Sequence, residues 1–151
     1  MFKNLRRNTR KMFREFLVYN HSSLEYRAKV ITLIVSANGD ICECEKQKIK
    51  EIAHGIYKDD QDRAELLIDT INEYHNKIVT KNGLDFEHLI QLVIRESKEV
   101  KRFTKKIDMA LLRTFSECID EDDEDEILYK ERILEFLQSL KDEYGDKRGV
   151  V

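Results

Sequence analysis

Acidic side chains gather in one short stretch, and their spacing is typical of a metal-binding loop. Eight of the ten residues 117–126 are Asp or Glu. Counted from Asp120, positions 1, 3, 5, 7, 8 and 12 are Asp120, Asp122, Glu124, Glu126, Ile127 and Glu131, the order of an EF-hand loop. Position 6 is Asp125, where the tight turn of that loop needs glycine. We therefore predict at most a weakly bound divalent cation, calcium or magnesium, on Asp120, Asp122, Glu124 and Glu131.

The same layout occurs about 86 residues earlier, between Ala37 and Glu45. This copy keeps the glycine, Gly39, followed by an isoleucine and a glutamate, but an EF-hand register would begin at Ile34, which cannot ligate. Asp40 and Glu45 are its candidate ligands. Because each copy fails as an EF-hand at a different place, the alternative is a duplicated helix joint. In that case the acidic residues only complement the start of a helix.

The other reactive side chains form weaker patterns. Three cysteines, Cys42, Cys44 and Cys118, are an odd number without disulfide density, which predicts free thiols in a reducing cytoplasm. A zinc or redox role for the Cys42-x-Cys44 pair is the alternative. The pairs Glu51-x-x-His54 and Asp85-x-x-His88 point away from the apolar faces of their helices, against a di-iron bundle. With no nucleophile or phosphate-loop motif either, we predict no enzymatic activity.

The first 20 residues are basic and amphipathic. Six Lys or Arg stand against one acid, Glu15, while residues such as Phe2, Phe13 and Phe16 share one side of a helical wheel. This pattern fits a helix formed by residues 1–17 that lies on an anionic membrane surface. Packing on the rest of the chain, or in a homodimer, is the alternative. Nucleic acid is not an expected partner, because this is the only segment that reads as basic.

Composition and apolar periodicity predict the elements that position these groups. The chain has 151 residues, no proline and 41% hydrophobic residues, which favours one all-α domain over residues 21–144, followed by a flexible tail over 145–151. Apolar spacing predicts helices over about 24–37, 43–57, 59–78, from Asp85, 97–119 and 126–143, six to seven in all with the N-terminal segment. Asp59-Asp60 opens the third helix, Asp85 caps the next, and Ser97 is expected to cap the longest of them. Asp123 and Glu126 offer a capping box that would begin the last helix earlier than the alignment of the two copies implies.

The joint Ala37-Asn38-Gly39-Asp40-Ile41-Cys42, with Glu45 three residues on, resembles the signature of the TerB (tellurite-resistance) family. The fold of that family is shared with the N-terminal domain of the co-chaperone DjlA. Asn38 and Cys42 replace the usual Asp and Ser, and the second copy has Asp125 for Gly and Leu128 for Ser. The resemblance covers about residues 22–143. It implies a TerB-like bundle in a bacterial stress-response or scaffolding module that binds partner proteins, cytoplasmic or peripheral at the inner membrane.

Overall fold

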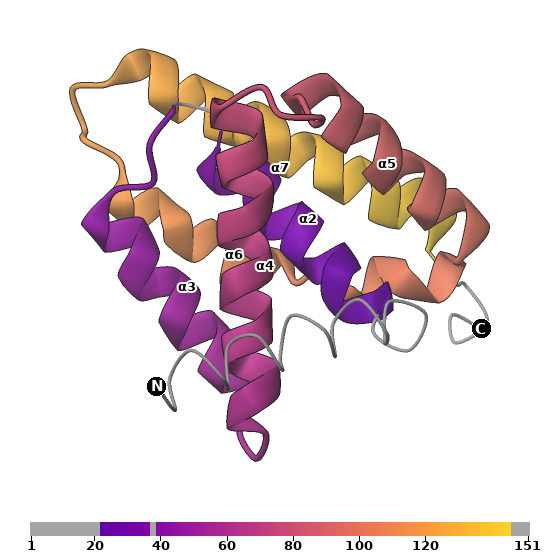
Figure 1. Ribbon diagram of the computed structural model, residues 1–151. Helices are drawn as coiled ribbons and strands as arrows, with labels where there is room; N and C mark the ends of the chain where they lie inside the picture. The colour runs from indigo at the N-terminus through magenta and orange to yellow at the C-terminus, as the bar shows by residue number, and fades with distance from the viewer. Residues whose placement is uncertain (1–21, 37–38, 146–151) are drawn as a thin grey trace.

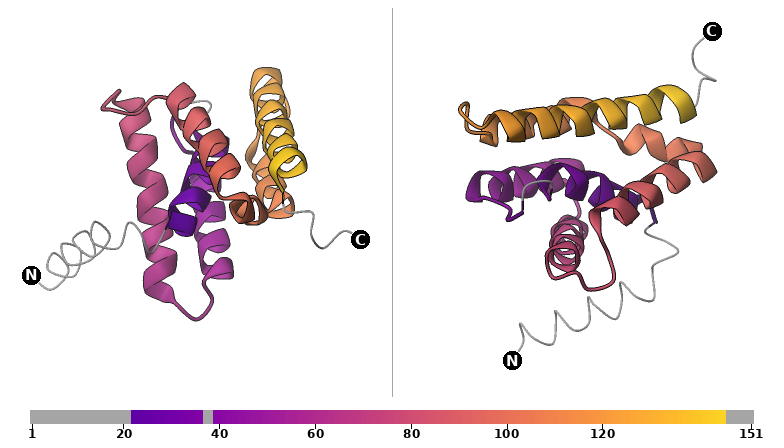
Figure 2. Two further views of the ribbon diagram at one scale, coloured as in Figure 1. Left: turned by 90° about the vertical axis from the view of Figure 1, so that its right-hand side faces the viewer. Right: turned by 90° about the horizontal axis from the view of Figure 1, so that it is seen from above.

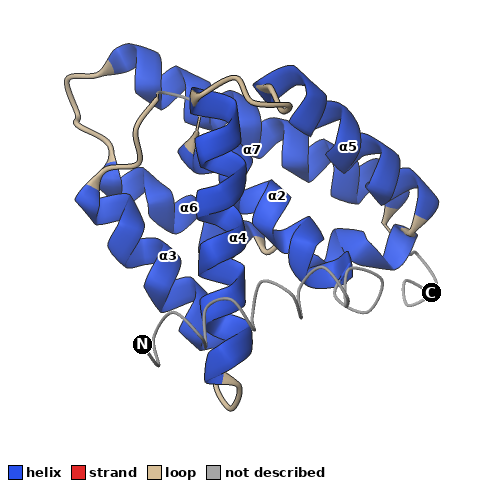
Figure 3. Ribbon diagram, viewed as in Figure 1, coloured by secondary structure: helices blue, strands red, loops and turns tan. Residues whose placement is uncertain are grey.

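Helices make up all the regular secondary structure in the described part of the chain. The computed structural model describes residues 22–36 and 39–145 (Figures 1 and 3). Its elements are α2 Ser22–Val35, α3 Glu43–Ile56, α4 Gln61–Val79, α5 Phe86–Glu99, η1 Lys101–Lys106, α6 Met109–Arg113, η2 Thr114–Cys118 and α7 Glu124–Tyr144. The prediction of an all-α fold of six to seven helices is confirmed. The predicted N-terminal helix and nearly all of the predicted tail lie outside the described residues.

Helix α2 is the central element of the bundle. It contacts α4, α5, α7 and η1, and the view from above shows it between α4 on one side and α7 on the other (Figure 2). Every residue from Val30 to Ser36 is buried, so this stretch is covered on all sides. The β-branched run there would suit a strand if it were read alone. It forms a helix because helices pack around it and its backbone groups bond within the helix.

Aspartates begin three of the other helices, as their positions predict. The side chains of Asp60, Asp85 and Asp123 each accept a hydrogen bond from the backbone N–H three residues on, at 3.0, 2.7 and 3.0 Å. An N-cap of this kind satisfies a backbone donor that the first helical turn leaves open. Local side-chain chemistry therefore sets where α4, α5 and α7 begin.

The predicted long helix over 97–119 is wrong. Ser97 lies inside α5, where its hydroxyl bonds the carbonyl of Val93 at 2.7 Å and contacts the Tyr26 hydroxyl at 2.7 Å. Val100 leaves the helical region, at φ −125° and ψ 82°, and ends α5. Asp108 then caps α6 through the N–H of Leu111. An aspartate that bonds its own backbone nearby competes with a continuous helix, so the apolar period continues through two 3-10 turns and a short helix.

The two ends of the described fold lie close to η1. Helix α2 begins beside it and α7 ends beside it, because both contact this turn. A search of the described helices finds none that combines the length and the apolar character of a membrane span.

Candidate functional site

The two acidic joints meet at one end of the bundle and line a common pocket. Its volume is about 540 Å³. The first joint, between α2 and α3, and the second, between η2 and α7, both contribute side chains. The lining residues are Ile34, Val35, Asp40, Cys42, Glu45, Cys118, Asp120, Asp123, Asp125, Glu126 and Lys130. Six of them carry a carboxyl group and one carries an ammonium group, so the pocket is strongly acidic.

A buried ion pair joins the two halves of the pocket. Lys130 Nζ lies 2.6 Å from Glu45 Oε2 and 3.4 Å from Glu126 Oε1. The side chains of Lys130 and Glu45 are only 3% and 6% exposed. Glu45 also accepts the backbone N–H of Cys42 at 3.3 Å, so one carboxylate both caps α3 and binds α7. Such a pair is costly to desolvate and therefore depends on both partners being present.

The two joints are built in different registers. Gly39 has φ +96° and makes the turn of the first joint, and α3 then begins after Cys42. In the second joint Asp123 is the N-cap, so Asp125, which aligns with Gly39 in sequence, already lies in the first turn of α7. The expectation that this helix begins earlier than the aligned copies imply is confirmed. The structural counterpart of Glu45 is therefore Glu126, the third residue of α7, and both glutamates bind Lys130.

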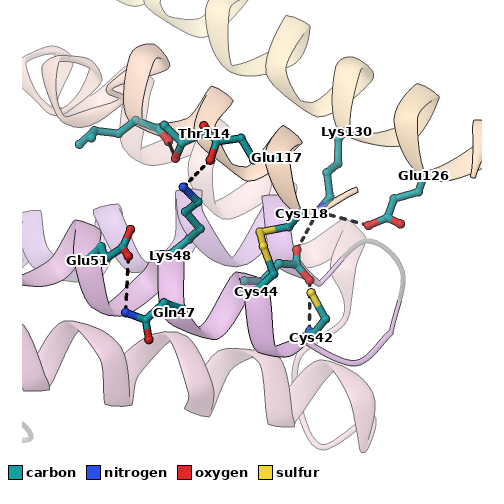
Figure 4. The surroundings of a disulfide bond; sticks show 12 residues. Cys42, Cys44, Gln47, Lys48, Glu51, Thr114, Glu117, Cys118, Glu126 and Lys130 are labelled. Carbon is teal, nitrogen blue, oxygen red and sulfur yellow. Dashed lines mark hydrogen bonds and ion pairs between the residues drawn. A yellow bond between two sulfur atoms is a disulfide. The ribbon is translucent and has the colours of Figure 1, made fainter. Parts of the chain in front are cut away.

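A disulfide closes the same end of the molecule, and the prediction of free thiols is wrong for two of the three cysteines. Cys44 and Cys118 are bonded, with their Cα atoms 5.5 Å apart, while Cys42 is free and exposed. The contact between α3 and η2 brings the two cysteines within disulfide range. Figure 4 shows the bond beside the ion pairs of Lys48 with Glu117 and of Lys130 with Glu126. The spacing of the cysteines gave no sign of this pairing, because 74 positions separate the partners.

Two basic groups near the pocket have shifted pKa values. Burial lowers the pKa of His75, and the carboxylates of Asp40 and Glu45 oppose this shift only in part. The His75 ring contacts Ser36, the residue after α2, with Nδ1 2.8 Å from Oγ. Near the disulfide, the 2.6 Å hydrogen bond to Glu117 raises the pKa of Lys48 (Figure 4). The charged lysine thus reinforces the contact beside the disulfide.

The structure brings together three of the six predicted cation ligands. Asp40, Glu45 and Asp120 line the pocket. Asp122, Glu124 and Glu131 are exposed and do not line it. Throughout residues 22–36 and 39–145, no three His, Cys, Asp or Glu side chains lie close enough together to hold a metal ion. Glu45 is already bound to Lys130, so the six residues form no ready coordination shell, and cation binding stays a prediction from the sequence.

Sequence reasoning missed the residue at the centre of the site, Lys130. The only local signal was its i, i+4 spacing from Glu126, which is common on exposed helix faces. Asp123 was expected only as a helix cap, and it is also part of the pocket wall. No sequence pattern indicates the pairing of Lys130 with Glu45, 85 residues away, because that contact depends on how α3 and α7 pack.

Comparison with known proteins gives no relative for this chain: no family model, no curated protein and no solved structure matches it. The resemblance to the TerB family therefore stays a prediction. The function has to be argued from the geometry of the pocket.

Proposed function

We propose that this protein is a non-enzymatic scaffolding module whose acidic pocket binds a basic segment of a partner protein. The observation that carries the proposal is the meeting of the two joints in one pocket. Six carboxyl groups line it, and Lys130 is the single lysine or arginine among the described residues that does so. The resemblance to the TerB family supplies the setting, a bacterial stress response at or near the inner membrane.

Lys130 illustrates the chemistry that the pocket offers. Its ammonium group lies between the carboxylates of Glu45 and Glu126, one from each joint. Four more carboxylates, on Asp40, Asp120, Asp123 and Asp125, form no ion pair with any lysine or arginine of the described segments. Because these carboxylates line one pocket, an incoming ammonium or guanidinium group can form charge-assisted hydrogen bonds with them.

The basic segment of a partner suits this site better than a small polar substrate. The four aspartates of the pocket are exposed, whereas Glu45 and Lys130 are buried and paired with each other. The pocket thus has a rigid floor and a charged, accessible rim. Rim charges of this kind favour rapid association and selection by charge.

A divalent cation is the second candidate ligand. Asp40 and Asp120 were predicted from separate joints, and they line the same pocket. Calcium or magnesium would take carboxylate oxygens of this kind, with water completing its shell. The observed side chains provide no finished site, so binding would require the rim to rearrange around the ion.

The test measures binding of a fluorescein-labelled peptide rich in lysine and arginine by fluorescence anisotropy. The pocket variant carries Asp40→Asn, Asp120→Asn and Asp125→Asn, which remove three rim charges and keep the side-chain shapes. We expect its affinity to fall on the order of tenfold, because each exposed charge pair contributes roughly 0.2–1 kcal/mol.

The matched control carries Asp122→Asn, Glu124→Gln and Glu131→Gln. It removes the same number of charges, from residues of the second joint and α7 that lie outside the pocket. An equal loss in both variants would show that only net charge matters and would contradict binding of the peptide in the pocket.

Thermal melting with calcium or magnesium tests the second candidate, because a bound ion raises the melting temperature. A rise that the pocket variant abolishes and the control retains would support the cation.

A further inference from the structure

The opposite end of the bundle carries a second charged surface, of the other sign. The turn η1 contains four basic residues in six, Lys101, Arg102, Lys105 and Lys106. Its Phe103 and Thr104 are buried, whereas Lys101, Arg102 and Lys105 are exposed. The turn therefore fixes its apolar residue in the core and presents its cations to solvent. This contradicts the expectation that only the N-terminal segment is basic.

Helix α2 adds Arg27 to the same surface, and we call these five residues the basic face. Burial lowers the pKa of Lys106, and the neighbouring positive charges of Arg27 and Arg102 lower it further. Lys106 therefore lies near the positive charges of both arginines. Their crowding costs free energy unless an anion lies against them.

No carboxylate of the described segments forms an ion pair with any member of the basic face. Arg27 and Arg102 instead lie over the rings of Tyr57 and Phe103, 5.6 and 5.7 Å from the ring centres. Lysines elsewhere do pair, as Lys29 does with Glu96 at 2.7 Å and Lys130 with Glu45 at 2.6 Å. The fold thus leaves this cluster uncompensated.

The chain enters and leaves the described fold beside the basic face. Helix α2 begins next to η1 and α7 ends next to it (Figure 1). In the sequence, residues 1–20 hold six Lys or Arg and one acid, and residues 145–151 hold Lys147 and Arg148 with one acid. The sequence on both sides of the described fold is therefore basic.

We propose that the basic face docks on an anionic phospholipid surface. Clustered Lys and Arg residues are the usual means of recognising acidic headgroups. Non-specific binding of single-stranded nucleic acid relies on exposed rings that stack on bases, and the ring in η1, Phe103, is buried. The apolar residues interleaved with the N-terminal cations, among them Phe13 and Phe16, further favour a lipid surface, which accepts both kinds of side chain.

The experiment uses the full chain and sedimentation with phosphatidylcholine vesicles, with and without phosphatidylserine. The test variant carries Lys101→Gln, Arg102→Gln and Lys105→Gln. Each lost cation should weaken partitioning onto acidic vesicles roughly fivefold, so the triple variant should bind on the order of a hundredfold more weakly. Wild-type binding should fall as salt is raised and be absent on neutral vesicles.

A control variant carries Lys46→Gln, Lys50→Gln and Arg132→Gln, three exposed cations on α3 and α7. It has the same net charge as the test variant and should bind acidic vesicles as wild type does. Circular dichroism melting confirms that each variant is folded. Unchanged binding of the test variant, or an equal loss in the control, would overturn the proposal. The proposal would also be overturned if the test variant lost binding to a short DNA duplex but kept its binding to acidic vesicles, because the basic face would then bind nucleic acid.

Discussion

Lys130 is the residue on which the two halves of the acidic end depend. Its side chain is 3% exposed, and its ammonium group is bound by Glu45 from α3 and by Glu126 from its own helix. The i, i+4 contact with Glu126 is readable from the sequence. The contact with Glu45 is not, because 85 residues lie between the partners.

Replacing Lys130 by methionine should strongly destabilise the protein. The change keeps the length of the side chain but leaves Glu45 buried without a cation, which should lower the free energy of unfolding by about 3 kcal/mol. Urea denaturation with the disulfide intact measures this. Adding Glu45→Leu to the variant should recover part of the loss, since the only carboxylate then left without Lys130 is the more exposed Glu126. Lys50→Met, on the exposed face of α3, is the control, and a similar cost for both lysines would contradict the role given to Lys130.

At the scale of elements, the hydroxyl pair of Tyr26 and Ser97 joins the central helix to α5. Tyr26 is fully buried, and burial raises its pKa from 10.0 to about 12. The folded state therefore favours the protonated phenol. Below pH 10 both states are protonated, and this preference has no effect on stability. Between pH 10 and 12 the unfolded chain releases the proton while the folded chain keeps it, so stability falls.

The variant Tyr26→Phe should remove this part of the alkaline loss. The difference from wild type across that window should be roughly 2–3 kcal/mol, because each pH unit contributes about 1.36 kcal/mol. Urea denaturation at a series of pH values measures it. Tyr129→Phe, in a partly exposed position, should keep the wild-type profile. Parallel profiles for wild type and Tyr26→Phe would show that this phenol does not titrate differently on folding.

Some helix boundaries could be predicted from the sequence and others could not. The starts of α4, α5 and α7 could be predicted because Asp60, Asp85 and Asp123 act on their own backbone. The break of the segment 97–119 could not, because its apolar period is helical throughout. There the outcome depended on Ser97 bonding across to Tyr26 and on Asp108 starting a new helix. The same holds for the pocket. The two acidic joints could be recognised in the sequence, but their position side by side in the fold could not.

At the scale of the whole molecule, the Cys44–Cys118 disulfide should be a major source of stability. It closes a loop of about 74 residues, and the chain-entropy model assigns a loop of that length about 4 kcal/mol. Reduction should lower the melting temperature accordingly, and the pair Cys44→Ser and Cys118→Ser should behave like reduced wild type. Cys42→Ser should not lower stability, because this cysteine is outside the disulfide and serine is a preferred N-cap residue. Thiol titration provides the direct check, because unreduced protein with three reactive thiols would show that the bond does not form.

Opposite charges lie at the two ends of the bundle. The acidic pocket lies where α2 ends and α7 begins, and the basic face lies where α2 begins and α7 ends. At 1.5 Å per residue, the 21 residues of α7 separate the two ends by roughly 30 Å. The small net charge of −3 therefore gives no sign that the protein has one acidic and one basic surface. A protein docked through one of them would still present the other to a partner.

The central place of α2 bears on how the chain folds as it leaves the ribosome. This helix is made first among the described elements, yet its neighbours α4, α5 and α7 follow it, and α7 ends only at Tyr144. Its apolar residues therefore emerge long before the helix that completes their cover. Until α7 has been made, the growing chain carries the most hydrophobic helix of the fold incompletely covered. We therefore expect nascent chains that stop before α7 to bind chaperones or to aggregate.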